Sequence, residues 1–371
     1  MTRNGGTPSI ETSTEIKPAP LVSVIVPVYK AEAFLADCFD SLLGQSLKAI
    51  EIIAVNDASP DGSQRIIEDY AARDSRLRYI VNATNEAGLE SRIRGAELAH
   101  GHYLIFCDAD DRMPHNAVEI LYETARSTNA DIVHGRTREL RDSAAGKRLY
   151  NYDPFVAVTG RAFVNSLLGA VRGWNLWGKL YSRKAWNRAL GFLPRGKKWS
   201  LAEDLYAVFI IGLHSDIYAE TRETVYWYRQ PDMSYFADSD NVKRRIKDHV
   251  EVLALMRETT ATTNFAKSVS ARVDFLTKHI VASILRNLPP EEGLRQFAAA
   301  VVESRLGEKF LVRSADAKKN SYNQFSRGLI NATTFLREYG VRETGIALRR
   351  SLAVARKRGW QVILSIICDA R

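Results

Sequence analysis

Cysteine is scarce in this chain of 371 residues. The three cysteines, Cys38, Cys107 and Cys368, lie far apart in the sequence and show no paired spacing. This pattern argues against a disulfide framework and against a zinc site built on thiolates. A reducing compartment suits such a chain, so we expect a cytoplasmic protein.

Long apolar runs are also missing. No stretch reaches the roughly 18 apolar residues that a membrane-spanning helix needs. The longest candidate extends only from Trp360 to Cys368. Residues 1–20 are polar, contain three prolines and lack an apolar core, so they predict a disordered lead-in and not a signal peptide.

Several cofactor motifs are absent. No glycine-rich dinucleotide fingerprint follows the first predicted strand, and the chain has neither a P-loop lysine motif nor a His-Glu-x-x-His pair. A nucleotide bound by this chain would therefore lack a glycine loop around its phosphates. Its diphosphate would have to be held in another way, and a metal ion held by acids is the simplest one.

The composition is that of a globular protein, with 46% hydrophobic and 26% charged residues. The net charge of +9 is unevenly distributed. Residues 241–371 contain 24 Lys and Arg against 12 Asp and Glu, whereas residues 1–240 contain 28 against 31. The basic excess therefore lies in the C-terminal third, which could face an anionic lipid surface or polymer.

Alternating patterns in the first 110 residues predict an α/β fold. Apolar, β-branched runs predict strands at residues 21–28, 50–55, 77–81 and 103–107. Amphipathic patterns predict helices between them, at residues 31–45, 63–72 and 88–98, with Ser63 as a helix N-cap. Because strands alternate with helices, we expect a doubly wound, mainly parallel sheet.

Acidic residues follow two of these strands. Asp57 comes after the second, and Asp108-Ala109-Asp110-Asp111 comes directly after the fourth. Ligands of open α/β sheets bind at the carboxyl ends of the strands, and crowded carboxylates favour a divalent cation such as Mg²⁺ or Mn²⁺. An alternative is that Asp111 caps a helix suggested by Pro114 and that the other acids are solvated loop residues.

These residues belong to a longer series of motifs that resembles family 2 of the glycosyltransferases with the GT-A fold. The series runs in order through residues 21–235 and comprises Val22–Tyr29 with Glu32, Leu35, Ser41 and Gln45; Asn56–Ser59 with Asp61–Ser63; Asn85, Gly88, Arg92 and Gly95; Ala99–Tyr103 before Asp108-Ala109-Asp110; Trp177–Tyr181; Glu203-Asp204; and Tyr226–Gln230 with Ser234. The sequence departs from the pattern at Lys30 and Ile93, where Asn is common. Neither change removes an acid.

The resemblance implies roles for individual residues. Asp57 would accept a hydrogen bond from the pyrimidine N3–H, Asp108 would contact the ribose, and Asp110 would ligate the metal. Asp204 matches the family's catalytic aspartate and would act as general base. The remaining nucleotide-sugar-binding residues would be Pro27, Tyr29, Glu32, Arg92 and Ala109.

The resemblance also implies a division of the chain. We expect a GT-A catalytic domain at residues 21–240, with a donor half (21–125) and an acceptor half (126–240), followed by a basic helical region at residues 241–371. Aromatic and basic residues gather in the acceptor half between residues 140 and 201. Trp174, Trp199 and Glu203 are candidate acceptor contacts there, although tryptophan burial alone would explain the two Trp residues equally well.

The expected function is an inverting glycosyltransferase that depends on Mn²⁺ or Mg²⁺. Its donor would be a nucleotide-diphosphate sugar, with UDP expected, and its acceptor a hydroxyl of a glycan or a lipid-linked molecule. Two alternatives are a non-catalytic nucleotide-sugar or polymer-binding protein and a sugar-1-phosphate nucleotidyltransferase. We expect no nucleic-acid partner.

The C-terminal tail carries a separate expectation. Arg349-Arg350 and Arg356-Lys357-Arg358 share one helical face and precede the apolar run that begins at Trp360. This arrangement resembles an interfacial anchor for an anionic membrane. The alternative is that the run packs on the protein and the charges are solvated.

Overall fold

The computed structural model describes residues 19–141, 144–148, 157–168, 173–199, 202–229 and 239–271. The expected lead-in before residue 19, the helices expected beyond residue 271 and the basic tail lie outside the described residues.

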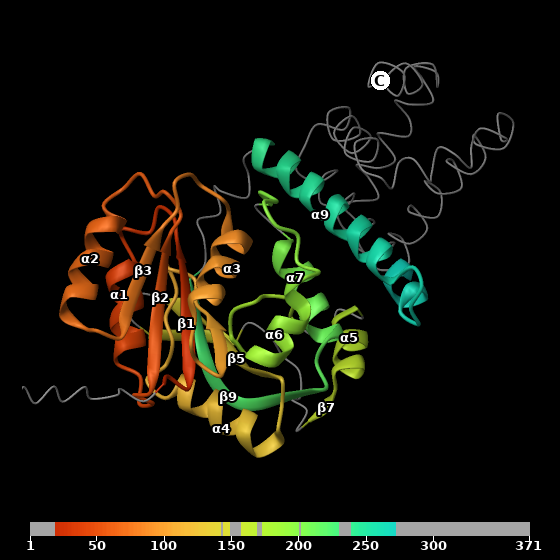
Figure 1. The fold of residues 1–371 in the computed structure, drawn as a ribbon, viewed down its shortest axis with the longest axis horizontal. Helices are drawn as coiled ribbons and strands as arrows, with labels where there is room; N and C mark the ends of the chain where they lie inside the picture. Colours follow the sequence, from red (N-terminus) through yellow and green to blue (C-terminus); the bar gives the residue numbers. More distant parts are fainter. Residues whose placement is uncertain are drawn as a thin grey trace, which may run out of the picture.

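The donor half alternates strands and helices as expected. Its elements are β1 (Val22–Val28), α1 (Leu35–Leu43), β2 (Ile50–Asn56), α2 (Ser63–Arg73), β3 (Leu77–Val81), α3 (Gly88–Leu98), β4 (Tyr103–Phe106) and α4 (Ala117–Thr128). Figure 1 shows β1, β2 and β3 side by side, with α1 and α2 on one side of the sheet and α3 on the other. This arrangement confirms the α/β fold class.

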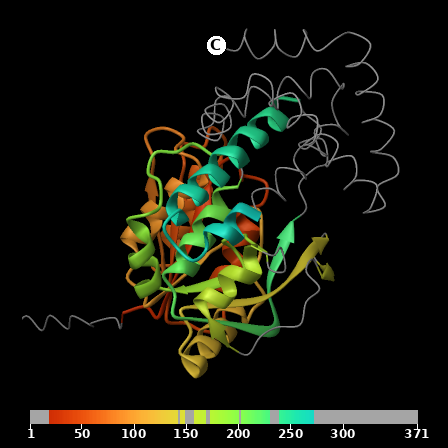
Figure 2. The same ribbon diagram turned by 90° about the vertical axis from the view of Figure 1, so that its right-hand side faces the viewer.

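The second half adds further strands and helices to the same sheet. Its elements are β5 (Ile132–Arg141), β6 (Ala144–Arg148), β7 (Val158–Thr159), α5 (Gly160–Leu168), β8 (Lys179–Ser182), α6 (Arg183–Leu190), α7 (Glu203–Leu213), β9 (Ile217–Arg229) and α9 (Ser239–Thr260). Helix α9 packs against α7, and it runs diagonally past α7 in Figure 1. The same helix is seen from another side in Figure 2.

The strand order is β3-β2-β1-β4-β8-β5-β9-β7, with β6 paired to β5. Pairing is parallel from β3 through β4 and between β5 and β9. Strand β8 is antiparallel to both of its neighbours, β4 and β5. The mainly parallel sheet that we expected therefore describes the donor half, and the acceptor half is mixed.

Two apolar cores cover the two faces of the sheet. Successive strand residues alternate between them, as the period of two demands: Val24 and Val26 of β1 enter the core beneath α1, α2 and α4, whereas Ile25 enters the core with α3. Helices α5, α6, α7 and α9 complete the second core. Because both faces are covered, ligands have access to the sheet chiefly at its edges.

Two local expectations were wrong. Ser63 is the first residue of α2 and not its N-cap, because Gly62 holds that position and the Ser63 hydroxyl accepts a hydrogen bond from the Ala31 amide at 3.3 Å. Helix α1 begins at Leu35 and not at residue 31. Among the described residues, no helix combines the length and apolar character needed to cross a membrane.

Candidate functional site

The carboxyl ends of β1 and β2 bring the predicted base-pocket residues together. Val28 pairs with Asn56, and the Asp57 amide donates to the Val28 carbonyl at 2.9 Å. Pro27 lies within β1, and the chain leaves the sheet at Tyr29, a residue that is 45% exposed. The two strands therefore deliver Tyr29 and Asp57 to one edge.

Glu32 ties the loop after β1 to the loop after β2. Its carboxylate accepts the Gly62 amide at 2.9 Å, and its own amide donates to Asp61 at 3.1 Å. The preceding residue, Lys30, has a φ of 54° and donates its amide to the Ser59 hydroxyl at 2.7 Å. Side chains thus fix the backbone of both loops. In this structure Glu32 shapes the edge by holding the loops.

The Asp57 side chain is buried at this edge. Its Oδ1 accepts two hydrogen bonds, from the Asn82 side chain and from the Glu86 amide, both at 2.8 Å. Asn82 also donates to the Ser91 hydroxyl at 3.1 Å, which links Asp57 to α3. The orientation of this carboxylate is therefore fixed by its neighbours.

Arg92 of α3 meets the acid that follows β4. Its Nη2 donates to Asp108 Oδ1 at 2.6 Å, in a charge-assisted hydrogen bond. Gly95 allows α3 to pack closely on β1 and β2. A Cβ there would lie 2.5 Å from Ile25 Cγ2 and 3.1 Å from Val55 Cγ2, so any side chain would force α3 or these strand residues to shift.

The same guanidinium faces two acids of the acceptor half. Arg92 Nη1 lies 3.8 Å from Glu203 Oε1 and 3.8 Å from Asp204 Oδ1. Arg92 is buried, and the three carboxylates around it raise its pKa despite that burial. One buried cation therefore joins the donor-side acid Asp108 to the predicted general base.

Glu203 and Asp204 begin helix α7, where the helix dipole favours negative charge. Burial raises the pKa of Glu203 to about 8, and the neighbouring Asp204 adds to the increase. Burial also raises the pKa of Asp204, and Asp108 contributes in the same direction while Arg92 opposes it. Asp204 Oδ2 accepts the Leu176 amide at 3.0 Å, and Oδ1 accepts no hydrogen bond from the described residues.

Tyr226 and Arg229 of β9 hold the acidic loop after β4. The Tyr226 hydroxyl donates to Asp111 Oδ2 at 2.7 Å and accepts the Asp108 amide at 3.0 Å. The Arg229 amide donates to Asp111 Oδ1 at 2.6 Å, and its Nε donates to the Asp110 carbonyl at 2.9 Å. Asp111 therefore anchors this loop to β9. The alternative in which it caps the next helix is wrong, since Asn116 is the N-cap of α4.

Asp110 is suited to hold a cation. Burial raises its pKa to about 6, and the nearby Asp108 carboxylate adds to this effect, so a positive charge beside it would be strongly favoured. The described residues contain no cluster of three or more His, Cys, Asp or Glu side chains that could enclose a metal by themselves. Mg²⁺ sites typically use one or two carboxylates together with substrate phosphates, and Asp110 with Asp108 beside it fits that pattern.

The candidate acceptor residues are placed differently from one another. Glu203 lies beside Arg92 as described above, and Trp174 is partly buried against the core. Trp199 is only 3% exposed, and its indole N–H donates to Glu251 of α9 at 3.1 Å. Trp199 is thus a packed core residue and offers no exposed ring face to a sugar.

The basic residues near Trp199 are paired with acids or carbonyls. Arg195 forms ion pairs with Glu90 and Glu97 at 2.8 and 2.6 Å, and the Lys198 ammonium donates to the Asn85 carbonyl at 2.7 Å. These contacts join the segment after α6 to α3 and to the residues that precede α3. The structure thus gives Arg195 and Lys198 partners within the protein.

Two residues of the site were not assigned from the sequence. Tyr226 and Lys179 each lie in a motif of the family resemblance, but nothing in the local sequence marks which atoms they would touch. Trp177, from the same motif as Lys179, stacks on Tyr226 and Tyr228 with ring centroids 4.8 and 5.1 Å apart. The sequence could therefore mark these residues only by their position within a motif, and their contacts are known only from the fold.

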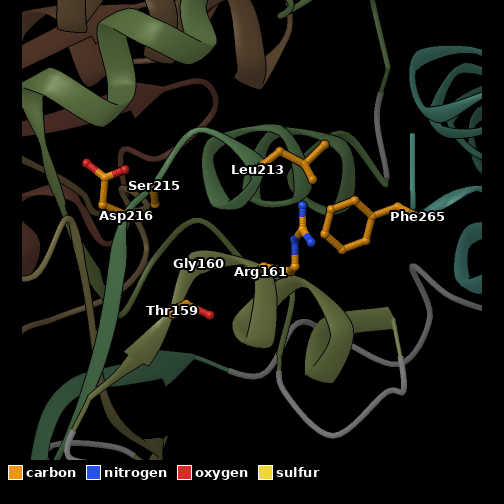
Figure 3. Close-up of a pocket in the computed structure, with 7 residues that line it drawn as sticks. All are labelled: Thr159, Gly160, Arg161, Leu213, Ser215, Asp216 and Phe265. Atoms are coloured by element: carbon orange, nitrogen blue, oxygen red, sulfur yellow. The ribbon is translucent and has the colours of Figure 1, made fainter. Parts of the chain in front are cut away.

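A separate hollow of about 270 Å³ lies where α5, the end of α7 and the segment after α9 meet (Figure 3). The Arg161 guanidinium sits between Leu213 and the Phe265 ring, 5.6 Å from the ring centroid. Asp216, the carboxylate of this hollow, is paired with Lys184 and Arg188 on the surface. None of the predicted site residues lines it, so we assign it no part in the chemistry.

Comparison with known proteins shows which families and sequences this chain resembles. The family model described as Glycosyl transferase family 2 matches residues 23–177. The uncharacterized glycosyltransferase EpsJ of Bacillus subtilis (strain 168) is 49% identical over 115 residues, which are 31% of this chain and 33% of that protein. Glycosyltransferase GlyA of Streptococcus pneumoniae serotype 4 is 31% identical over 218 residues, 56% of this chain and 30% of that protein. The chain thus spans about a third of the length of these relatives.

Solved structures show a similar fold. S. aureus TarS residues 1–349, in complex with UDP, superposes with a TM-score of 0.59 at 17% identity, covering 91% of each chain. The mannosyltransferase PcManGT from Pyrobaculum calidifontis, in complex with GDP-Man and Mn²⁺, gives 0.50 at 19% identity and covers 91% of this chain and 87% of that one. At these identities the similarity establishes the fold alone.

Proposed function

We propose that this chain, whose residues 23–177 match the family model of glycosyl transferase family 2, transfers a sugar from a nucleotide-diphosphate donor to an acceptor hydroxyl. The observation that carries the proposal is the convergence on Arg92. Asp108, which follows a donor-half strand, and Asp204, which begins an acceptor-half helix, both face this guanidinium. A donor and an acceptor bound at these two acids would therefore be neighbours.

The proposed reaction is a single in-line displacement with inversion at the anomeric carbon. Asp204 takes the proton of the acceptor hydroxyl as that oxygen bonds to the anomeric carbon. The bond from this carbon to the diphosphate oxygen breaks, and the diphosphate leaves with the electron pair. Asp204 Oδ2 accepts the Leu176 amide at 3.0 Å, which holds the carboxylate in one orientation for this step. A raised pKa suits a base that must accept a proton near neutral pH.

The donor is proposed to be a UDP-sugar held at the carboxyl edge of β1, β2 and β4. Asp57 would read the base, Asp108 the ribose, and Asp110 would hold Mg²⁺ or Mn²⁺. Such a cation, when bound, offsets negative charge on the diphosphate. One structural neighbour carries UDP and another carries GDP-Man with Mn²⁺, so the purine donor is the natural competitor in any test.

The acceptor is proposed to be a glycan or a lipid-linked molecule. The curated relatives that match this chain include a putative teichuronic acid biosynthesis glycosyltransferase of Bacillus subtilis, 36% identical over 100 residues. Assembly of a bacterial polysaccharide is the corresponding setting for this chain.

Titration calorimetry with UDP in the presence and absence of Mn²⁺, followed by a screen for release of sugar from nucleotide sugars, tests the proposal. We expect UDP binding that strengthens with metal, and metal-dependent turnover of a UDP-sugar. Binding of UDP without turnover of any donor and acceptor pair would favour a non-catalytic binding protein. Release of pyrophosphate from UTP and a sugar-1-phosphate would favour a nucleotidyltransferase. GDP-mannose serves as the competing donor.

A further inference from the structure

Lys179, the first residue of β8, is fully buried and takes no part in the reaction described above. Burial of an ammonium group costs free energy unless interactions with other groups replace its lost hydration. Its Nζ donates to the Asn175 carbonyl at 2.6 Å. The next amide along the chain, that of Leu176, donates to Asp204 Oδ2 at 3.0 Å.

These two hydrogen bonds use the two ends of one peptide group. The carbonyl of Asn175 and the amide of Leu176 belong to the same planar unit, so Lys179 contacts one end and Asp204 contacts the other. An ammonium on the carbonyl oxygen polarises the peptide and strengthens the hydrogen bond that its N–H donates. The following peptide group is also held, because the Tyr181 hydroxyl donates to the Leu176 carbonyl at 3.1 Å.

We propose that Lys179 is a positioning residue for the general base and acts on Asp204 through the Asn175–Leu176 peptide. The relay holds Oδ2 and so fixes the orientation of the carboxylate that takes the proton. The catalytic part of this inference rests on the proposed function. We use the term relay for the two hydrogen bonds themselves, from Lys179 to the Asn175 carbonyl and from the Leu176 amide to Asp204.

Charged groups from several elements surround the relay. Those that act on Asp204 are Arg92 of α3, Asp108 after β4, Glu203 of α7 and Lys179 of β8. Those that act on Lys179 are Asp204 and Glu220 of β9. Arg92 approaches Asp204 from the Oδ1 side, whereas the relay reaches Oδ2. The two cations thus address different oxygens of the base, so Arg92 cannot replace Lys179.

The test compares Lys179→Met and Lys179→Gln with a matched control, Lys184→Met, which alters an exposed lysine of α6. We expect Lys179→Met to lower kcat roughly 10- to 100-fold, the effect of losing a hydrogen bond to a charged group, with UDP affinity within about twofold of wild type. The acidic limb of the pH–rate profile should move to higher pH, because the Asp204 carboxylate loses a favourable interaction. Lys184→Met should match wild type in both measurements.

Lys179→Gln keeps a donor for the Asn175 carbonyl and removes the charge, so it covers the case in which Lys179→Met fails to fold. We expect its pH limb to move in the same direction. A folded Lys179→Gln or Lys179→Met with wild-type kcat and an unmoved limb would overturn the proposal.

A double-mutant cycle separates the relay from the proposed function. Urea unfolding of wild type, Lys179→Met, Asp204→Asn and the double variant needs no donor or acceptor. We expect the double variant to lose less stability than the sum of the single variants, since each breaks the same relay. Strict additivity would overturn the relay even in an active enzyme. Coupling in a protein without transfer activity would overturn the proposed function and leave the relay in place.

Discussion

The single guanidinium of Arg92 faces carboxylates from two distant parts of the chain. It bonds Asp108 directly and lies 3.8 Å from both Glu203 and Asp204. A buried charge that loses its partner is strongly destabilising, so these four residues have to be considered together. Substitutions of Asp204, Glu203 and the nearby Asp110 nevertheless separate proton transfer, stability and metal binding.

Asp110→Asn should abolish the metal dependence of UDP binding while the protein stays folded. The raised pKa of Asp110 shows that burial and the nearby Asp108 destabilise its charged form, which a bound cation would stabilise. The Asn side chain carries no negative charge and would attract a cation much less strongly. Calorimetry with and without Mn²⁺ provides the measurement, and Asp69→Asn on the exposed face of α2 is the control. UDP binding with an unchanged Mn²⁺ requirement would remove Asp110 from the metal site.

Asp204→Asn should lower turnover by roughly 10²- to 10⁴-fold, the range of general base catalysis, with UDP and metal affinity nearly unchanged. The amide retains an oxygen for the Leu176 N–H but cannot accept the acceptor's proton. Initial rates with a competent donor and acceptor check this, with Asp216→Asn on the surface as control. Near-normal transfer would leave Glu203 as the next candidate.

Glu203→Gln should stabilise the protein increasingly as the pH rises from about 4.5 to 8. The pKa of Glu203 is raised from 4.5 to about 8 in the folded chain, so the folded state holds a proton that the unfolded state has released. Wild type therefore loses stability across this interval, and the Gln variant escapes that loss. Thermal unfolding midpoints at pH 5 and pH 8 measure it, with Glu123→Gln on α4 as control. A gain that is larger at pH 5 would contradict the assignment.

The elements of the donor half were predicted from the sequence to within a few residues, because period and turn chemistry are local properties. The predicted strand at 77–81 and helix at 88–98 match β3 and α3. The strand ends also placed Asp57, Asp108 and Asp110 at one edge. Their roles toward nucleotide and metal remain predictions.

The rest of the site depends on contacts between distant elements. No local pattern shows that β8 inserts between β4 and β5, or that α7 brings Asp204 to Arg92. Aromatic composition also fails to distinguish a sugar-stacking ring from a core ring, which is why Trp199 was proposed as an acceptor contact and lies in the core. For Tyr226, the sequence showed the motif to which it belongs, but it did not show the hydrogen bonds of its hydroxyl to Asp108 and Asp111.

Strand β9 controls the acidic loop through Tyr226, so Tyr226→Phe should lower stability and weaken metal-dependent UDP binding together. The variant removes one partner from each of the buried Asp111 carboxylate and the Asp108 amide, which costs about 1–3 kcal/mol for a buried polar group left unpaired. The stack on Trp177 is preserved, because only the hydroxyl is lost. Urea unfolding and UDP titration measure the two effects. Tyr79→Phe, at an exposed ring of β3, is the control, and a Tyr226→Phe protein equal to it would disprove the anchoring role.

Charge is unevenly distributed along the whole chain, because the excess of basic residues lies beyond residue 240. We propose that the tail from Glu343 onward contributes to binding at anionic membranes, where basic residues provide about 1 kcal/mol each. The full chain should sediment with anionic vesicles more than a chain truncated before Glu343, and neither should sediment with neutral vesicles. Equal sedimentation of both chains with anionic vesicles would eliminate the tail as an anchor.

The position of β8 between β4 and β5 has a consequence for how the chain matures on the ribosome. Strand β4 is complete at Phe106, but its antiparallel partner begins only at Lys179. Translation of the residues between them takes on the order of 4 to 14 s at about 5–20 residues per second. During this interval one edge of β4, next to the acids that it positions, has no partner strand and could pair with another nascent chain. Lys179 and Asp204 are synthesised after β4, so the proposed relay cannot form until the chain has been made at least as far as Asp204.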